Sequence, residues 1–163
     1  MRDEDGFTAF YEHHRSSLLR ALTATLSDPQ LAADATDEAL VRAAERWELV
    51  STMARPDGWV YRVGVNWATS WRRKWSRRPT LPTSVLDGVH RDDLASVSML
   101  EELVTLPLQQ RQMLVLRFVL GYSTAETAVA LGVAEGTVKS SVSRARGRLR
   151  GDRDSQEVLD GRA

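Results

Sequence analysis

The chain of 163 residues contains no cysteine, which excludes disulfide bonds, thiol catalysis and zinc sites with cysteine ligands. It also lacks any apolar run near the roughly 18 residues that a membrane-spanning helix requires. The N-terminal sequence MRDEDGF is acidic, the opposite of a signal peptide. We therefore expect a cytoplasmic protein with no membrane insertion.

Strand signals are nearly absent too, since apolar and polar residues do not alternate over any sustained stretch. Helical spacings dominate, and 42% hydrophobic residues are enough to form real cores. Residues 79–98 hold two prolines and a glycine among small polar residues, which is typical of a linker, with a long ordered loop as the alternative. We predict an all-α fold in which a flexible linker joins two small helical domains, residues 1–78 and 99–151, followed by a frayed tail at 152–163.

The formal net charge of zero is an average over segments of opposite sign. Residues 1–50 carry five basic and ten acidic groups, whereas residues 51–78 carry seven basic groups and one acidic group. The charge reverses again in residues 79–135, with three basic and seven acidic groups, and residues 136–151 hold five basic groups and no acid. Two basic patches indicate two contacts with nucleic acid, and the acidic stretches leave a face for a different partner.

The stretch from Ser123 to Arg150 predicts a helix-turn-helix with a basic second helix. Ser123 and Glu126 have the spacing of a capping box, and Gly132 suits the left-handed turn that ends the first helix. The second helix has a narrow apolar stripe, formed by Val138, Val142, Ala145 and Leu149. The opposite face carries Ser140, Ser143 and Gly147, flanked by Lys139 and Arg144. Small polar residues allow close approach to a base edge, and the cations can reach phosphates or guanine. This face therefore favours DNA binding over the alternative, a basic helix that is merely solvated.

Apolar spacing predicts three helices in the first domain, at residues 6–26, 29–49 and 56–76. The third has a polar stripe that can follow a phosphate backbone, made of Arg62, Asn66, Thr69 and Arg73. Asn66 suits a base contact because its amide both donates and accepts hydrogen bonds. Trp67 and Trp71 lie opposite this stripe, which favours positions in the core over stacking on unpaired bases. For Trp75, both a core position and base stacking remain as alternatives.

The helix at 29–49 has an acidic face with an exposed aliphatic residue, which is a plausible surface for docking a protein. This face consists of Asp34, Glu38, Val41, Arg42 and Glu45. A metal-dependent hydrolase is the enzymatic alternative, because Asp34, Asp37, Glu38, His13 and His14 include metal-ligating types. Their spacing forms no metal motif, and the chain has neither a phosphate-binding glycine loop nor a nucleophile elbow. We expect no catalytic residues, no metal and no cofactor.

Three blocks in order resemble the extracytoplasmic-function (group IV) sigma factors of bacterial RNA polymerase, and more loosely their sigma-E-like members. The first block reads DATDEALVRAA, from Asp34 to Ala44, and is the least specific of the three. The second reads WVYRVGVNWA, from Trp59 to Ala68. The third runs from Leu106 to Ser140 and contains the family's leucine-proline start and its glycine-threonine-valine-lysine-serine end. The resemblance covers about residues 7–150, with gaps across the linker.

The resemblance implies a two-domain sigma factor that binds core RNA polymerase and promoter DNA, with an anti-sigma protein as a potential further partner. The polymerase clamp would contact the first domain at Asp34, Glu38, Val41 and Arg42. The minus-ten element would be read and opened by Arg62, Asn66, Thr69 and Arg73, with Asn66 holding an unstacked base. The minus-thirty-five element would be read by Thr137, Lys139, Ser140, Ser143, Arg144 and Arg148.

The chain departs from the family pattern at Asp37, where glutamine is usual, at Ala44, where tryptophan is usual, and at Ala134, where a serine commonly caps the second helix. The first two departures bear on affinity for polymerase. A second hypothesis is a stand-alone helix-turn-helix regulator that binds duplex DNA without polymerase. That hypothesis leaves the Asn66 helix and the acidic face without a role.

Overall fold

The computed structural model describes residues 3–76 and 101–160, and it contains helices and no strand in these two ranges. The first range forms α1 (Glu4–Leu26), α2 (Pro29–Glu45), α3 (Trp47–Val50) and α4 (Pro56–Trp75). The second forms α6 (Leu108–Phe118), α7 (Thr124–Leu131) and α8 (Glu135–Asp160). The all-α prediction is confirmed, and the linker predicted at 79–98 lies outside the described residues. No helix in the described ranges is long and apolar enough to cross a membrane.

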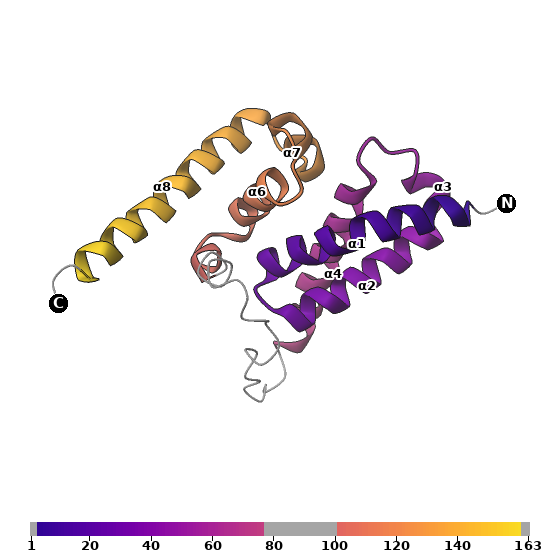
Figure 1. The fold of residues 1–163 in the computed structure, drawn as a ribbon, viewed down its shortest axis with the longest axis horizontal. Coiled ribbons are helices and arrows are strands. Elements are labelled where there is room, and N and C mark those ends of the chain that lie inside the picture. Colours follow the sequence, from indigo (N-terminus) through magenta and orange to yellow (C-terminus); the bar gives the residue numbers. More distant parts are fainter. Residues whose placement is uncertain (1–2, 77–100, 161–163) are drawn as a thin grey trace.

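The first module, α1 to α4, packs α1, α2 and α4 around a core of leucine, alanine and valine. Asp3 caps α1 by accepting the amide of Gly6 at 2.9 Å, and Asp28 caps α2 by accepting the amide of Leu31 at 3.0 Å. Ser27 separates the two helices in the left-handed conformation, with φ of 55°. These local signals turn the chain back on itself and place α2 antiparallel to α1 (Figure 1).

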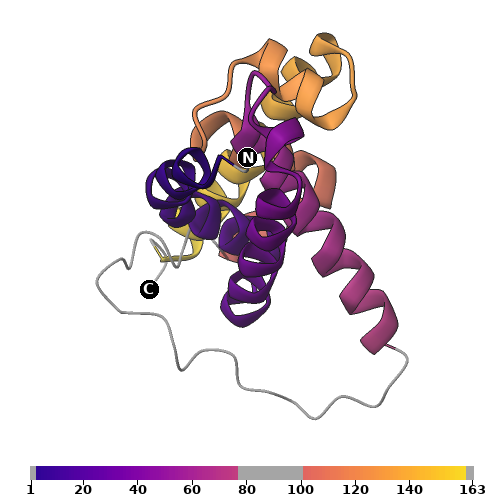
Figure 2. The ribbon, with the colours of Figure 1, turned by 90° about the vertical axis from the view of Figure 1, so that its right-hand side faces the viewer.

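Small residues let α4 pack closely against α1 and α2. A Cβ atom on Gly64 would lie 2.9 Å from Leu22 Cδ1 and 3.4 Å from the carbonyl oxygen of Ala35, so a side chain at this position would displace the fully buried Leu22. Ala35 and Ala39 on α2 are completely buried. The close crossing fixes the direction of α4, and Figure 2 shows its C-terminal half projecting beyond the other helices of the module.

The helix predicted over 29–49 is divided at Arg46, so this prediction was wrong in its second boundary. Arg46 leaves the helical conformation with φ of −115°, and the short helix α3 follows. The Trp47 ring lies 5.4 Å from that of Phe7 and 5.1 Å from that of Phe10. Packing of this indole against two rings of α1 accompanies the break.

The second module, α6 to α8, is built on the predicted helix-turn-helix. Met113 and Leu116 of α6 are completely buried, as are Val138 and Ala145 of α8. The two remaining members of the predicted apolar stripe, Val142 and Leu149, pack partly buried against the same core. The prediction of a frayed tail at 152–163 is wrong for residues 152–160, because α8 continues to Asp160.

The two modules are in direct contact. Helix α6 lies against α1, and α7 lies against the start of α4, while α8 extends away from the first module (Figure 1). Arg111 of α6 donates to the carbonyl oxygen of Thr25 in α1 at 2.6 Å. Buried apolar residues of both modules belong to one continuous cluster. Composition alone predicted a linker between the modules and gave no sign of this interface.

Candidate nucleic-acid interface

The helix-turn-helix forms through the local signals that the sequence predicts. The amide of Glu126 donates to Ser123 Oγ at 3.0 Å, and Glu126 Oε2 accepts the amide of Ser123 at 2.8 Å. This reciprocal pair is the predicted capping box at the start of α7. Gly132 ends α7 in the left-handed conformation with φ of 66°. The capping box and the glycine turn are both confirmed.

The exposed face of α8 presents all six residues that the sequence predicts for an upstream DNA element: Thr137, Lys139, Ser140, Ser143, Arg144 and Arg148. Ser140 Oγ donates to the carbonyl oxygen of Gly136 at 2.9 Å. Arg144 Nε donates to the carbonyl oxygen of Ser140 at 3.3 Å, so this guanidinium lies folded along its own helix. These intrahelical bonds keep the small hydroxyl and the cation together on the face that can enter a groove.

Arg146 is a contact that the sequence reasoning missed. Its guanidinium lies 4.7 Å from the centre of the Phe118 ring, between α8 and α6. A groove of about 550 Å³ runs beside this pair, lined among others by Arg117, Lys139 and Ser143. Helical spacing could not reveal this contact, because Phe118 belongs to a different helix and only the tertiary fold brings it beside Arg146.

On α4, the predicted stripe stands open to solvent along most of its length. Arg62, Asn66 and Arg73 are exposed, while Thr69 is half-buried and donates its hydroxyl to the carbonyl oxygen of Val65 at 3.0 Å. Arg72 has a structural role instead, since it donates to the carbonyl oxygen of Leu26 at 2.5 Å and so binds the end of α1. The stripe is therefore a row of one amide and two guanidinium groups that can face a nucleic acid.

The expectation that Trp71 lies in the core is wrong. Its side chain is 39% exposed and stacks on Trp75, with ring centres 5.4 Å apart. This half of α4 projects beyond α1 and α2, so no core is available to cover the indole. Trp67, one turn earlier, is partly buried and packs against the core, as the helical wheel predicts.

A hollow of about 290 Å³ lies between α2 and α4 and joins two predicted sites. Its lining includes Arg42 of the protein-docking set and Asn66 of the nucleic-acid set, together with Trp67, Trp71 and Lys74. Positive charge, an amide and an aromatic ring therefore meet in one place. These are the groups that contact phosphates, base edges and base faces.

The acidic face of α2 is exposed as predicted, with Val41 at 55%. Asp34 is exposed beside it, and Glu38 accepts from Arg42 Nε at 2.9 Å. Asp37 pairs with Arg15 of α1 at 3.6 Å. Within the part of the chain that the structure describes, no three metal-ligating side chains gather as an ion site would need. The exposed Val41 beside these charged groups can contact a protein partner.

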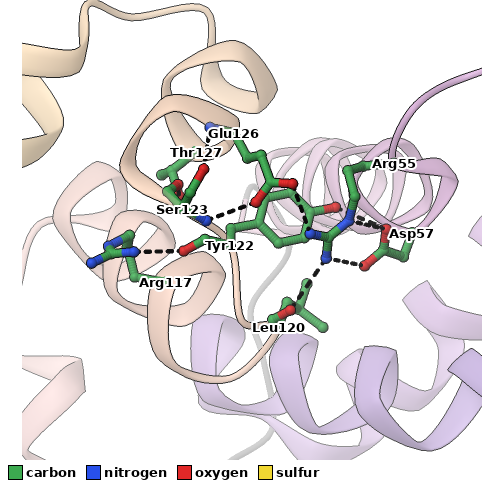
Figure 3. A network of polar contacts seen from close by, with 8 residues as sticks. All are labelled: Arg55, Asp57, Arg117, Leu120, Tyr122, Ser123, Glu126 and Thr127. Atoms are coloured by element: carbon green, nitrogen blue, oxygen red, sulfur yellow. Dashed lines mark hydrogen bonds and ion pairs between the residues drawn. The ribbon is translucent and has the colours of Figure 1, made fainter.

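A third polar group, the Arg55 cluster, consists of Arg55, Asp57, Tyr122 and Glu126 and joins the two modules (Figure 3). Arg55 donates from Nε and Nη2 to the two carboxylate oxygens of Asp57 at 3.2 and 3.1 Å. Its Nη1 donates to Glu126 Oε1 at 3.2 Å, and its guanidinium lies 3.7 Å from the centre of the Tyr122 ring. Tyr122 donates its hydroxyl to Asp57 Oδ1 at 3.0 Å.

The electrostatics of this cluster follow from its burial. Burial opposes ionisation of Asp57, but hydrogen bonds from Arg55 and Tyr122 outweigh it and hold the pKa of the carboxyl below its ordinary value. Burial also raises the pKa of Tyr122, and the neighbouring Asp57 charge raises it further. Asp57 is thus an anion and Tyr122 a neutral donor at physiological pH. No sequence motif predicts the cluster, because Arg55 and Asp57 lie more than 60 residues from Tyr122 and Glu126 in the chain.

Comparison with known families finds two matching sequence patterns. The pattern described as Sigma-70 region 2 matches residues 10–78, and the pattern described as Sigma-70, region 4 matches residues 96–149. The chain is 35% identical over 161 residues to the RNA polymerase sigma-E factor of Streptomyces coelicolor, covering 96% of this chain and 90% of that protein. It is 33% identical over 151 residues to the ECF RNA polymerase sigma factor SigM of Mycobacterium tuberculosis, covering 90% and 76%.

Among solved structures, the sigma factor RpoE from Bartonella quintana, determined with the anti-sigma factor NepR, aligns with a TM-score of 0.76. Its sequence identity is 24%, over 90% of this chain and 96% of that one. CnrH, determined with the cytosolic domain of CnrY, aligns with a TM-score of 0.69 and 21% identity, over 94% and 90%. At these identities the two structures support the fold.

We expect Ala134→Ser to strengthen the start of α8. The Ala134 carbonyl oxygen accepts the amides of Thr137 and Val138 at 3.0 and 3.2 Å, so this residue occupies the cap position without a capping side chain. A serine hydroxyl there can accept a free amide of the first turn and stabilise it by about 0.5–1 kcal/mol. Slower hydrogen exchange at the amides of the first turn of α8, relative to the unchanged chain, would confirm this. Unchanged exchange would contradict it.

Proposed function

Because this chain belongs to the sigma-70 family of RNA polymerase sigma factors, in the extracytoplasmic-function group, we propose that its two modules divide the reading of a promoter between them. As a sigma factor, it binds core RNA polymerase and directs promoter-specific initiation of transcription. The observation that carries the division is that each module exposes its own basic surface, on α4 and on α8. Residues 1–78 form the clamp-binding and minus-ten module, and residues 99–151 form the minus-thirty-five module.

In the first module, the minus-ten element lies along Arg62, Asn66, Thr69 and Arg73. The guanidinium groups bind phosphates, and the Asn66 amide holds a base that has left the stack. Capture of that base offsets part of the cost of unpairing, so opening needs no ATP. The exposed stack of Trp71 on Trp75 offers a flat apolar surface nearby on which an unpaired base can pack.

In the second module, α8 enters the major groove of the minus-thirty-five element. Ser140 and Ser143 permit close approach, and Lys139, Arg144 and Arg148 supply positive charge. Arg144 must leave the Ser140 carbonyl to reach a guanine, which is a small rearrangement of an exposed side chain. Thr137 lies at the start of α8, where its hydroxyl can contact the adjoining phosphate.

The polymerase clamp docks on the α2 face formed by Asp34, Glu38, Val41 and Arg42. Negative charge keeps this face away from the DNA phosphates, and Val41 supplies apolar contact. An anti-sigma protein can compete for the same surfaces, since the sigma factor RpoE, which has a similar fold, was solved in complex with the anti-sigma factor NepR. Polymerase carries out the chemistry, so the chain itself has no catalytic activity. The proposed site of action is the cytoplasm.

The central test is promoter-specific run-off transcription with purified chain and core polymerase. We expect a discrete transcript only when both are present. Tight, sequence-specific binding of duplex DNA by the chain alone, unaffected by polymerase, would instead identify a stand-alone regulator.

We expect Asn66→Ala to reduce promoter opening by about tenfold while leaving binding to core polymerase unchanged. That factor corresponds to the loss of one hydrogen bond to the captured base. Opening is measured by permanganate reactivity of the minus-ten strand, and polymerase binding by fluorescence anisotropy. Gln109→Ala, which removes an exposed amide on α6, is the matched control. Equal losses of opening and of polymerase binding would contradict the role of Asn66.

We expect Arg144→Ala to weaken promoter binding by about 1–3 kcal/mol and to relax the preference at one upstream base pair, if Arg144 makes a bidentate base contact. The measurement is binding of the polymerase holoenzyme to a set of promoters that differ at single upstream positions. A uniform loss across the whole set would make Arg144 a phosphate contact instead.

A further inference from the structure

A hollow of about 670 Å³ opens at the end of the first module away from α8, where the start of α1 meets the end of α2 and the short helix α3 (Figure 1). Its apolar lining comes from all three helices: Phe7 of α1, Ala44 of α2, and Trp47 and Leu49 of α3. The Phe7 and Trp47 rings meet edge to face, with centres 5.4 Å apart, and Leu49 is 60% exposed. The hollow therefore offers aromatic and aliphatic surface to a partner.

The residue at position 44 accounts for part of this space. Tryptophan is usual here in the sigma-factor pattern that the sequence resembles, whereas this chain has alanine. Ala44 is exposed and lines the hollow, so an indole in its place would occupy part of the space beside the Phe7 and Trp47 rings. A ring brought by a partner can supply the packing that this chain lacks.

Trp47 also lacks a polar partner. Its Nε1 is buried and has no hydrogen-bond partner among the residues that the structure describes. A buried N–H group without an acceptor is costly, because it has lost its water and gained nothing in return. A partner seated in the hollow can bring a carbonyl oxygen to this side chain.

The hollow is rimmed mainly by negative charge. Four carboxylates and one guanidinium line it: Asp3, Glu4, Glu45, Glu48 and Arg46. The carboxylates of Glu4, Glu45 and Glu48 form no ion pair with any residue that the structure describes. Unpaired carboxylates around an apolar hollow favour a ligand that brings positive charge beside its apolar group, and they disfavour an anionic one.

The position of the hollow next to the proposed docking face distinguishes two kinds of partner. Val41 of that face lies three residues before Ala44, on the same side of α2. Core polymerase serves every sigma factor in a cell, so its clamp must also accept sigma factors with tryptophan at this position. A space that exists because this chain lacks the tryptophan therefore suits a partner that binds this sigma factor and rejects the others.

We propose that this hollow receives an aromatic side chain which a protein partner specific to this sigma factor presents next to a lysine or arginine. The ring fills the space beside Ala44, and the cation lies among the carboxylates of the rim. The proposal rests on the proposed function only through the docking of polymerase on the adjoining face of α2.

Two small probes test the chemistry of the hollow. Tryptamine and indole-3-propionate carry the same ring on the same two-carbon chain, one ending in an ammonium group and the other in a carboxylate. Binding to the full chain is followed by nitrogen-15 NMR through the indole N–H of Trp47, which is assigned with Trp47→Phe. We expect tryptamine to shift this resonance at millimolar concentration and indole-3-propionate to bind about fivefold more weakly, a difference that shrinks in high salt. Equal binding of the two probes, or shifts confined to residues outside the hollow, would overturn the proposal.

Ala44→Trp is the central variant, because it fills the hollow with the residue that is usual in the family. We expect it to weaken tryptamine binding by about tenfold, since the probe's ring can no longer be buried. Binding to core polymerase, measured by fluorescence anisotropy, should not weaken, since the clamp accepts tryptophan there in other sigma factors. Parallel loss of tryptamine and polymerase binding would make the clamp the occupant and overturn the proposal.

Glu45→Gln combined with Glu48→Gln keeps the hollow open and removes charge, which provides a second test in case Ala44→Trp disturbs folding. We expect the preference for tryptamine to fall to about twofold in this double variant, because two of the attracting carboxylates are gone. Glu101→Gln, which removes an exposed carboxylate of the second module, is the matched control and should keep the full preference. A full preference that survives the double variant would contradict the role of the rim and overturn the proposal.

Photocrosslinking in the cells that produce the chain tests the partner itself. A benzophenone amino acid replaces Thr8, an exposed residue that lines the hollow, and the crosslinked peptides are identified by mass spectrometry. We expect a peptide with an aromatic residue beside lysine or arginine, formed by the chain with Ala44 and lost with Ala44→Trp. A polymerase peptide, an acidic peptide, or no product that depends on Ala44 would overturn the proposal. None of these measurements requires transcription, so failure of run-off activity would affect the proposed function and leave this result standing.

Discussion

The buried carboxylate of Asp57 is the constraint around which the two modules are arranged. A charged group that is 4% exposed requires partners, because an unpaired buried charge costs several kcal/mol. Arg55 supplies two bonds from the same module, and the remaining bond comes from Tyr122 of the other. The sequence places Asp57 in the first turn of α4, where it also favours the helix dipole. One residue in the first turn of α4 thus also helps to position the helix-turn-helix against this helix.

The elements that could be predicted from the sequence are those set by neighbours in the chain. Ser123, Glu126 and Gly132 determine the start and end of α7 through bonds that span three or four residues. The stripe of Arg62, Asn66 and Arg73 follows from helical periodicity and is exposed as expected. Trp71 shows where this reasoning fails: a helical wheel gives the side opposite the polar stripe, but it does not say whether another helix covers that side. The Arg55 cluster could not be predicted from the sequence either, since packing between the modules brings its two halves together.

The number of basic residues alone does not show how many of them can contact DNA. The arginines that the structure describes include two groups with different chemistry. Arg55, Arg72 and Arg111 donate to backbone carbonyls or to a buried carboxylate, and these bonds join helices. Arg62, Arg73 and Arg144 are exposed on helix faces that can reach a phosphate or a base. The guanidinium group suits both tasks because it offers five donors in a rigid plane. The local excess of positive charge therefore overstates how many cations are available to nucleic acid.

The hollow between α2 and α4 gives a physical reason for polymerase binding and promoter opening to depend on each other. Arg42 belongs to the proposed docking face of α2 and Asn66 to the predicted stripe of α4, yet both line the same 290 Å³ space. Arg42 is bonded to Glu38 in the free chain. A partner that takes Glu38 as a ligand would release the Arg42 guanidinium towards that space and add positive charge beside Asn66. Under the proposed roles of Arg42 and Asn66, core polymerase would then improve the site for an unpaired base and its phosphate, and capture of the base would depend on the enzyme that uses the opened strand.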